Sequence, residues 1–221
     1  MEELSFTSGD VVIPALLVRP PAAWTLLVLG HGAGAGMRHV FMESLAAALA
    51  ERGVATLRYT FPYLVHGRGR IDPPAVLEQC VRAATACAAG AAPDLPLCAG
   101  GKSMGGRMTS RAAAHAPGLD ARALVFFGFP LHPAKRPAIE RAAHLPDVPQ
   151  PMLFLQGTRD DLADLELVRQ VVAPLSRATL HVVEHADHGF GVLKRSGRTS
   201  DAVLAELADT ASAWLRAQLA A

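Results

Sequence analysis

Short apolar runs alternate with longer amphipathic stretches along the chain. The apolar runs, such as residues 25–30 and 54–59, have the length of single strands. The stretches between them place apolar residues at helical spacing, as Phe41, Leu45 and Leu49 do. Strands that alternate with helices are typical of a sheet covered by helices, so the pattern predicts an α/β fold with a mostly parallel sheet flanked by helices.

The same pattern gives the order of the expected elements. Strands are expected at residues 11–18, 25–30, 54–59, 95–100, 123–129, 152–157 and 179–184. Helices are expected near residues 38–52, 74–89, 104–115, 162–172 and 200–219. The first strand is expected to pair antiparallel with a neighbour near the N-terminus. Because no repeat, linker or low-complexity block interrupts this order, residues 1–221 are predicted to form one domain.

Composition and charge narrow the class of protein. Of the 221 residues, 51% are hydrophobic and 19% are charged, and the net charge is +1. So small a charge offers no global field to nucleic acid or to an anionic membrane, and neither is an expected partner. No apolar run is long enough for a transmembrane helix, and the acidic N-terminus does not resemble a secretory signal. Cys80, Cys87 and Cys98 form no disulfide framework, so we expect a reducing compartment, the cytoplasm by default.

The strongest chemical signal is a glycine-rich turn between an expected strand and the expected helix at 104–115. Residues 101–105 read Gly-Lys-Ser-Met-Gly, a G-x-S-x-G motif centred on Ser103. Glycines two positions before and after the serine relieve the crowding of a tight strand-to-helix turn. The serine then lies at a helix N-terminus, where free N–H groups and the helix dipole favour developing negative charge. We interpret Ser103 as a nucleophile; a helix-capping serine beside packing glycines is the alternative.

The Gly-Lys-Ser sequence that ends at Ser103 could also end a phosphate-binding loop, which would indicate a different class of protein. That loop requires G-x-x-x-x-G-K-S, and Pro96 occupies the position of its first glycine. Leu97 and Cys98 continue an apolar strand where a flexible phosphate cradle should begin. The spacing therefore argues against a nucleotide-binding loop.

A serine hydroxyl needs a base that takes its proton, and the base needs an acid that orients it. Asp160 and Asp161 come just after the expected strand at 152–157, which places a carboxylate at the carboxyl edge of the sheet, beside the nucleophile turn. We choose Asp160 as the acid and keep Asp161 as its competitor, because the unused aspartate can cap a helix.

The base is expected after the last strand before the closing helix, where residues 185–190 read His-Ala-Asp-His-Gly-Phe. His188 lies deeper in this loop and can reach back over the sheet edge, whereas His185 abuts the strand. We therefore assign the base to His188. A metal site formed by the two histidines has no supporting cysteine or carboxylate cluster, so no metal and no cofactor is expected.

Acyl transfer also requires backbone N–H groups aimed at the oxyanion. The turn itself places the Met104 N–H there, and the second donor is expected in the glycine-rich loop at 31–36. Ala33 is the candidate, with Gly34 next, and His31 is expected to fix the loop rather than act as a second base. The glycines of this loop are spaced G-x-G-x-G, not G-x-G-x-x-G as in a dinucleotide-binding turn.

The chain contains, in order over nearly its whole length, the segments LGHGAGAGM, RYTFPY, LEQCVRAA, CAGGKSMGGRM, FFGFPLHPA, LFLQGTRD and EHADHGF. Together they resemble a widespread bacterial group of conserved α/β-hydrolase-like proteins. That group is distantly similar to dienelactone hydrolases and to a hydrolase-like subunit of a nuclear histone acetyltransferase complex. The resemblance implies an α/β-hydrolase fold with Ser103 as nucleophile, Asp160 as acid and His188 as base, in the chain order of such enzymes. Dienelactone hydrolases carry cysteine where this chain has Ser103.

Features around the predicted site bound its substrate. The segment between the expected strands at 123–129 and 152–157, where many α/β-hydrolases insert a helical cap, is short and contains several prolines. We therefore expect no large cap domain, and an open site for small or flexible acyl substrates. The residues predicted to contact the substrate are Gly32, Phe61, Phe129 and His132.

Basic residues gather in loops at the predicted catalytic edge: Arg68, Arg70, Lys135, Arg136, Arg159, Lys194 and Arg195. Such a rim could steer an anionic ester or a phosphate-bearing thioester, although solvated loop charges are the simpler interpretation. Together the residues predict a serine hydrolase that cleaves a small ester or thioester by acyl transfer. The alternative is a hydrolase-fold scaffold that binds without catalysis. A complete serine, acid and histidine set argues against a scaffold, and the residues indicate no oligomeric state.

Overall fold

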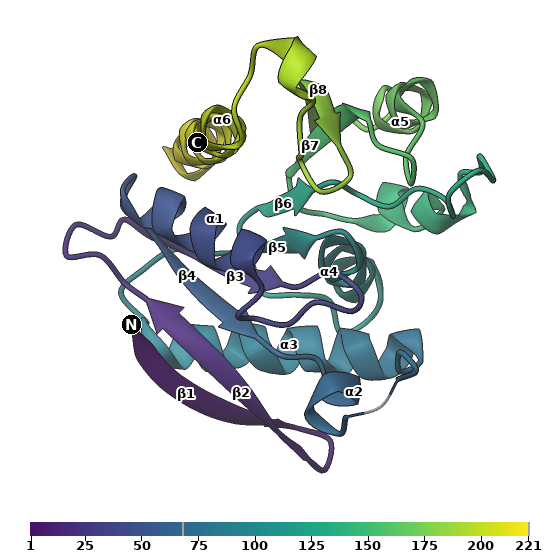
Figure 1. The fold of residues 1–221 in the computed structure, drawn as a ribbon. Helices are drawn as coiled ribbons and strands as arrows, with labels where there is room; N and C mark the ends of the chain where they lie inside the picture. Colours follow the sequence, from purple (N-terminus) through teal and green to yellow (C-terminus); the bar gives the residue numbers. More distant parts are fainter. Residues whose placement is uncertain (68, 221) are drawn as a thin grey trace.

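An eight-stranded sheet runs through the computed structural model, which describes residues 1–67 and 69–220 (Figure 1). Its strands are β1 (Glu2–Ser8), β2 (Val11–Val18), β3 (Thr25–Gly30), β4 (Val54–Tyr59), β5 (Leu97–Lys102), β6 (Leu124–Phe127), β7 (Met152–Arg159) and β8 (Ala178–Asp187). Across the sheet they lie in the order β1-β2-β4-β3-β5-β6-β7-β8. β2 is antiparallel to both β1 and β4, and every other neighbouring pair is parallel. The predicted mostly parallel sheet and the antiparallel pairing of its first expected strand are confirmed.

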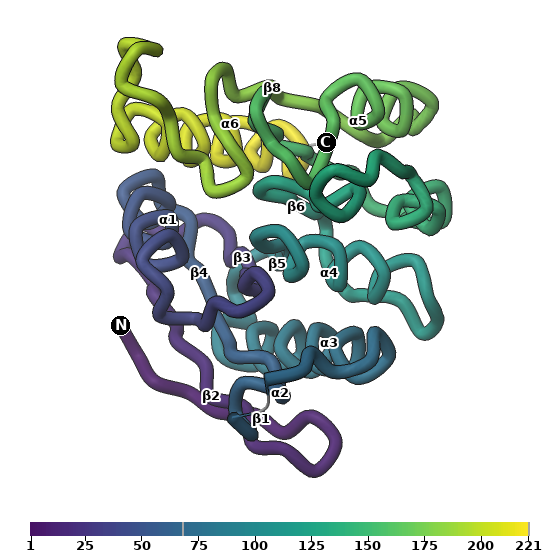
Figure 2. The backbone as a smooth tube through the Cα atoms, turned by 45° about the vertical axis from the view of Figure 1, so that its right-hand side comes forward, coloured from purple at the N-terminus to yellow at the C-terminus, as the bar shows by residue number. Residues whose placement is uncertain are grey.

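Helices cover both faces of this sheet (Figures 1 and 2). One face is covered by α1 (Val40–Ala50) and α6 (Ser200–Ala220). The other face is covered by α3 (Pro74–Ala91), α4 (Met104–Ala114) and α5 (Leu165–Val172). A short helix, α2 (Pro62–Val65), follows β4, and a 3₁₀ turn, η3 (Lys194–Ser196), precedes α6. The layers therefore read helix, sheet, helix, as the α/β pattern predicts.

The central strand β3 shows why its sequence is apolar without interruption. Successive side chains of a strand point to opposite faces. Leu26 and Val28 accordingly pack with α3 and α4, whereas Leu27 and Leu29 pack with α1 and α6. A strand buried on both faces has no position for a solvated side chain. Each such leucine or valine contributes roughly 1.5–3 kcal/mol by leaving water.

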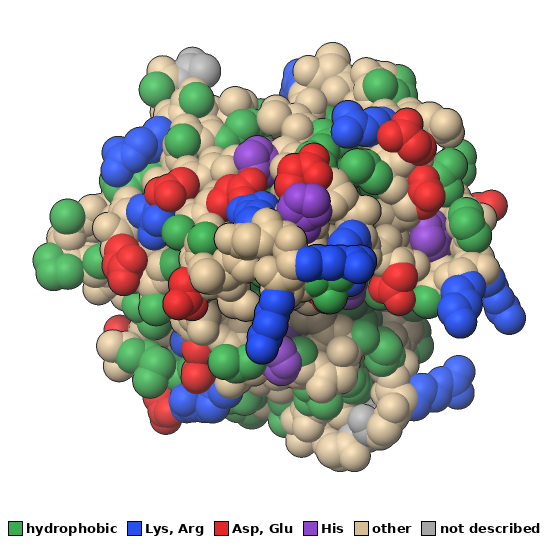
Figure 3. Space-filling model, turned by 45° about the horizontal axis from the view of Figure 1, so that its top comes forward, with side chains coloured by type: hydrophobic (Ala, Val, Ile, Leu, Met, Phe, Trp, Pro, Cys, Tyr) green, Lys and Arg blue, Asp and Glu red, His purple; other side chains and the backbone are tan. Residues whose placement is uncertain are grey.

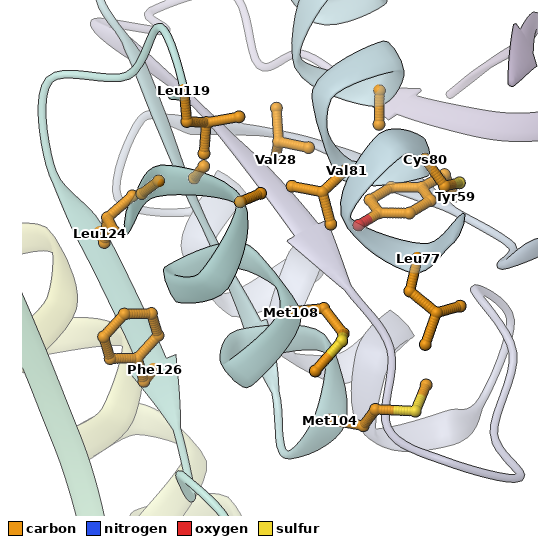
Figure 4. Close-up of a cluster of buried hydrophobic side chains, with 14 of the residues drawn as sticks. Val28, Tyr59, Leu77, Cys80, Val81, Met104, Met108, Leu119, Leu124 and Phe126 are labelled. Atoms are coloured by element: carbon orange, nitrogen blue, oxygen red, sulfur yellow. The ribbon is translucent and has the colours of Figure 1, made fainter. Parts of the chain in front are cut away.

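The apolar cluster on the α3 and α4 side of the sheet includes residues of both helices and of the strands below them (Figure 4). Val28 of β3, Val81 of α3 and Met108 of α4 point toward one another there. Met104, at the start of α4, belongs to the same cluster and is 6% exposed. The packing thus fixes the N-terminus of α4, which is the element that begins next to Ser103.

Several elements differ from the expected boundaries: β5 lies at Leu97–Lys102 and not at 95–100, β6 is shorter than 123–129, and β7 and β8 extend beyond their expected ends. β8 continues to Asp187, so that His185 lies in the strand and only His188 of the two histidines lies beyond it. This extension pairs with β7 through Arg159 and Asp187 after an irregularity in register. β8 is the last strand of the sheet and carries mixed polar and apolar residues there, so its end has no apolar signature. β1 and the single turn of α2 were not given bounds by the apolar pattern.

The connections place a crevice at the carboxyl ends of β3 and β5. From β3 the chain passes through α1 to β4 on one side, and from β4 it returns through α3 to β5 on the other side of β3. The loops that leave β3 and β5 therefore diverge, and such a switch point is where open α/β sheets bind ligands. The loop at 31–36 and the turn at Ser103 both lie at this switch point.

The segment from 128 to 151, all of it described, contains only two 3₁₀ turns, η1 (Glu140–Ala142) and η2 (Leu145–Asp147). The expected absence of a large cap is therefore confirmed for this connection between β6 and β7. Among the helices of the described chain, none combines the length and the apolar character that crossing a membrane requires.

Candidate active site

Ser103 occupies a strained turn between β5 and α4. Its backbone has φ of 50° and ψ of −117°, a conformation that costs a residue with a side chain of order 1–3 kcal/mol. Its N–H donates to the Phe127 carbonyl of the neighbouring strand at 3.1 Å, and its own carbonyl accepts from Arg107 N. The turn is thus held by β6 on one side and by α4 on the other. This strained backbone conformation projects the Ser103 hydroxyl from the edge of the sheet.

Two glycines of the G-x-S-x-G motif are required by close approach to β3. A Cβ added to Gly101 would lie 2.4 Å from the Gly30 carbonyl oxygen, and one added to Gly105 would lie 2.2 Å from the same oxygen. Neither distance is possible for a carbon and a backbone oxygen without movement of a strand. The motif glycines therefore allow α4 to start against β3, as the sequence interpretation requires.

The structure brings Ser103, His188 and Asp160 into one hydrogen-bonded chain. Ser103 Oγ lies 2.9 Å from His188 Nε2, and His188 Nδ1 lies 2.9 and 2.8 Å from the two carboxylate oxygens of Asp160. An ionised carboxylate only accepts, so Nδ1 carries the imidazole proton and Nε2 is free to accept from the serine hydroxyl. This is the arrangement in which a histidine can take a proton from serine.

Asp160 is held by protein groups on every side. Its side chain is completely buried, and its oxygens accept from Gln156 Nε2 at 2.5 Å and from Leu162 N at 2.8 Å. Gln156 in turn accepts from Phe129 N through its other amide atom. Asp161, in contrast, is exposed, and no hydrogen bond of its side chain is found within the described chain. Asp160, and not Asp161, therefore contacts His188.

The segment that carries His188 is fixed by Asp187, the last residue of β8. Asp187 Oδ1 accepts from Gly189 N and from Gly191 N, each at 2.9 Å. Phe190 is buried between them and stacks on Phe41 of α1, with ring centroids 5.7 Å apart. His185 lies back on the exposed part of β8. The loop therefore presents His188, not His185, to Ser103.

Lys102 ties the nucleophile turn to the His188 loop. Its ammonium donates to the His188 carbonyl at 2.5 Å and lies 5.3 Å from the centre of the Phe190 ring. Burial lowers the pKa of Lys102 to about 8, against the opposing effect of Asp160 and Asp187. Sequence reasoning did not find this residue, because the second position of G-x-S-x-G accepts any side chain. Gln156 carried a signal in the sequence, because a polar side chain within the apolar run 152–157 is expected to be buried and to need hydrogen-bond partners.

The two backbone N–H groups predicted to bind the oxyanion belong to residues that border the same cavity as Ser103. Met104 N begins α4, and Ala33 N lies in the loop after β3; both residues border the same cavity as Ser103. Within residues 1–67 and 69–220, no hydrogen-bond acceptor is found for either group. Gly34 N, the other candidate donor, already donates to the Tyr63 hydroxyl at 3.3 Å. The structure thus leaves Met104 and Ala33 available.

His31 is fully buried below this loop. Its Nδ1–H donates to the Gly32 carbonyl at 2.8 Å, and its Nε2 accepts from Phe61 N at 3.0 Å. Burial lowers the pKa of His31 to about 4. Both nitrogens are therefore occupied, and the side chain fixes the loop in the neutral form.

Acid should destabilise the protein through His31. Its folded pKa lies below the ordinary value of 6.5, so the unfolded chain binds the proton at a higher pH than the folded chain. Stability is therefore full above about pH 6.5, and between pH 7 and 5 His31 should remove about 2 kcal/mol. His144, whose pKa burial also lowers to about 4, acts in the same direction.

Urea unfolding at pH 7, 6 and 5 measures this effect. His31→Gln keeps an acceptor for Phe61 N but cannot titrate, so its stability should fall less steeply with acid. His66→Gln, at an exposed position, should keep the slope of the unaltered protein. Equal slopes for all three proteins would contradict this assignment.

Two cavities meet at Ser103. The larger, about 830 Å³, is bordered by Ser103, Ala33 and Met104 and extends along α4. The smaller, about 300 Å³, is bordered by Ser103, Ala33 and His188 and extends toward α1. Gly32 borders the smaller cavity, as predicted for a substrate contact.

Three of the predicted substrate contacts lie elsewhere. Phe61 is completely buried against the ring of His31, and Phe129 is buried among other aromatic rings of the sheet. His132 is buried, with Nδ1 bonded to the Pro133 carbonyl and Nε2 accepting from Asp164 N. These side chains pack against neighbouring segments or hydrogen-bond to them. None of the three borders either cavity.

The predicted basic rim is mostly dispersed. Lys135, Arg136, Lys194 and Arg195 are exposed in loops, and Arg159 donates to the His185 carbonyl. Arg68 lies outside the described residues. Figure 3 shows basic and acidic side chains interspersed over the face that it presents. Of the described residues of this rim, only Arg70 borders the larger cavity, together with Arg107 and Arg141, which sequence reasoning missed.

In the part of the chain that the structure describes, the residue types that bind metals do not gather into a site. Across residues 1–67 and 69–220, no group of three or more His, Cys, Asp or Glu side chains could hold a metal ion. Cys80, Cys87 and Cys98 are free thiols, and burial raises the pKa of each.

Comparisons with known proteins agree with this fold. Residues 23–216 match the sequence profile of the alpha/beta hydrolase domain. A dienelactone hydrolase from Anabaena variabilis superposes with a TM-score of 0.76 at 23% identity, over 97% of this chain and 96% of that one. An alpha-beta serine hydrolase homologue from Coxiella burnetii gives 0.77 at 20% identity, over 95% and 96%. A serine hydrolase without lid from Xanthomonas campestris gives 0.75 at 21% identity, over 96% and 94%.

Proposed function

The chain belongs to the alpha/beta hydrolase domain family, and from this membership we propose that it is a serine hydrolase that cleaves small esters or thioesters by acyl transfer. Ser103 is the nucleophile, His188 the base and Asp160 the acid. The continuous hydrogen-bond chain from Asp160 through His188 to Ser103 Oγ supports this proposal most directly. Serine hydrolases among proteins of the same fold support it further.

In the acylation step, Ser103 Oγ attacks the carbonyl carbon while its proton moves to His188 Nε2. Asp160 stabilises the imidazolium that forms. The oxyanion accepts from Met104 N and Ala33 N, and loss of one such donor typically costs about 10²–10³ in rate. The bond to the leaving oxygen or sulfur then breaks, and Nε2 returns the proton to that atom. An alcohol or thiol departs, and the acyl group stays on Ser103.

In the deacylation step, a water molecule attacks the acyl carbon and gives a proton to His188 Nε2. The bond between that carbon and Ser103 Oγ breaks, and Nε2 returns the proton to Oγ. The products are a carboxylic acid and the original serine. Water and the ester are the only reactants, so the proposal includes no cofactor.

The uncapped sheet edge bears on the size of the substrate. Ser103 opens onto both cavities, and the segment 128–151 places no helical domain over them. A site without a cap does not enclose a long apolar chain in protein. We therefore propose small or flexible acyl substrates.

A panel of p-nitrophenyl esters from acetate to dodecanoate tests the proposed function. We expect saturable hydrolysis with the highest kcat/KM at short or medium acyl length and a decline for the longest chains. The release of p-nitrophenol is followed by absorbance, with buffer alone as the reference rate. A rate equal to buffer at every chain length would contradict the proposal, and an optimum at dodecanoate would contradict the substrate size.

A further inference from the structure

The two cavities at Ser103 divide a bound ester into two halves. The smaller cavity is bordered by His188 and Gly189, whereas neither residue borders the larger one. The leaving atom must receive its proton from His188 Nε2, so it has to lie on the histidine side of the scissile bond. The leaving group therefore extends into the smaller cavity, and the acyl chain extends into the larger one.

The larger cavity, into which the acyl chain extends, is rich in guanidinium groups. Arg70, Arg107 and Arg141 border it, together with a single carboxylate, Asp72. Arg107 lies one helical turn beyond Ser103 on α4, and Arg141 lies in η1. Three positive charges against one negative charge leave an excess of positive charge around the acyl chain.

No described residue supplies a carboxylate partner to these arginines. Within the described residues, none of the three guanidinium groups forms an ion pair or donates a hydrogen bond. Arg107 Nε is buried and has no acceptor at all. Burial and the charges of Arg141 and Arg111 together lower the pKa of Arg107 to about 10. An uncompensated, partly buried guanidinium carries a desolvation cost that an anionic ligand would offset.

Two neighbouring arginines, Arg111 and Arg82, do lie beside a carboxylate. Arg111 of α4 donates to Glu78 at 2.7 Å, and Arg82 of α3 lies within 3.9 Å of the same carboxylate. Glu78 also contacts His115. Glu78 therefore pairs with Arg82 and Arg111, which do not border the larger cavity, whereas within the described residues the arginines that border it keep their donors free.

From these contacts we infer that the acyl group of the substrate carries a carboxylate at its far end, bound by Arg107 and Arg141 in the larger cavity. Guanidinium groups bind carboxylates through paired, charge-assisted hydrogen bonds, which fix both position and orientation. The product of such a reaction is a dicarboxylic acid. This inference rests on the proposed function, because it assigns a substrate class to the same serine.

Matched pairs of esters test the inference. Mono-p-nitrophenyl esters of adipic and suberic acid are compared with p-nitrophenyl hexanoate and octanoate, which have the same chain lengths and leaving group but no second carboxylate. We expect kcat/KM to be at least about 10-fold higher for the carboxylated member, the gain of one charge-assisted hydrogen bond. Equal values, or a preference for the neutral member, at both lengths would overturn the inference.

Three variants test whether Arg107 and Arg141 cause the preference for carboxylated esters. Arg107→Gln and Arg141→Gln should each lower the ratio of carboxylated to neutral kcat/KM on the order of 10- to 100-fold. Arg122→Gln removes the same charge at an exposed position before β6, at the opposite end of the strands, and should keep the ratio. If Arg107→Gln does not fold, Arg141→Gln carries the test alone. A ratio unchanged in whichever of the two folds would overturn the inference.

Hydrolysis of the neutral esters distinguishes a failure of the carboxylate subsite from a failure of the proposed serine hydrolase activity. Turnover of p-nitrophenyl octanoate without a preference for the suberate ester overturns the carboxylate subsite and leaves the serine hydrolase in place. Failure to hydrolyse any of the four esters, together with failure to label Ser103 by a neutral fluorophosphonate, overturns both.

Discussion

Replacing Ser103 with alanine should lower kcat for p-nitrophenyl acetate on the order of 10⁶-fold, the cost of removing the nucleophile from a triad that acts as a unit. Without Oγ, no acyl-enzyme forms, and His188 has no hydroxyl to deprotonate. The residual rate should come from the oxyanion donors alone. Initial rates over a range of enzyme concentrations measure the loss down to the buffer rate.

We expect Ser103→Ala to leave the stability of the fold nearly unchanged, so that a loss of activity can be assigned to the missing hydroxyl. Ser103 makes its structural contacts through its backbone, whose N–H donates to Phe127. A thermal melt should therefore stay close to that of the unaltered protein. Ser176→Ala, at an exposed loop position, serves as the matched control and should keep full activity. Retention of activity by Ser103→Ala would remove the serine from the mechanism.

Asp160→Asn should lower kcat by about 10⁴-fold while leaving Ser103 and His188 in place. An asparagine can donate to His188 Nδ1, which forces the imidazole proton onto Nε2. Nε2 then donates to Ser103 Oγ and cannot accept its proton. The loss therefore comes from the tautomer of His188, and it should appear in kcat more than in KM.

The adjacent aspartate supplies the control for this prediction. Asp161→Asn makes the same chemical change one residue away, at an exposed side chain. We expect its kcat to stay within about 2-fold of the unaltered protein, because surface substitutions away from such networks have small effects. Equal losses at Asp160 and Asp161 would show that the carboxylate pair, and not Asp160 alone, orients the histidine.

Much of the fold follows from local sequence pattern. β2, β3 and β4 begin and end at the predicted residues, and β3 and β4 are buried at every position. The end of β8 could not be predicted, since an edge strand mixes polar and apolar residues up to Asp187. The turn at Ser103 was predictable because a tight strand-to-helix turn leaves no room for a Cβ at the positions of Gly101 and Gly105.

The surroundings of the site depend on contacts between distant segments, which no local pattern encodes. Lys102 meets the His188 carbonyl across 86 positions of the sequence, and Gln156 meets Phe129 across 27. Arg107 and Arg141 border one cavity although 34 positions of the sequence separate them, and the segment between β6 and β7 that carries Arg141 contacts α4 through η2. Phe61 and Phe129, both predicted to contact the substrate, are buried instead. Whether such a ring faces the cavity or the core depends on packing with neighbours that the chain order does not reveal.

Reaction with a fluorophosphonate, followed by intact-mass measurement and peptide mapping, tests the central claim most directly. The probe phosphonylates a serine only where a base has activated the hydroxyl. We expect a single adduct on Ser103, formed in minutes by the unaltered protein and by Asp161→Asn, and not by His188→Ala. The absence of an adduct on Ser103 in the folded protein, or equal labelling of the His188→Ala variant, would show that the chain carries a hydrolase fold without an activated serine.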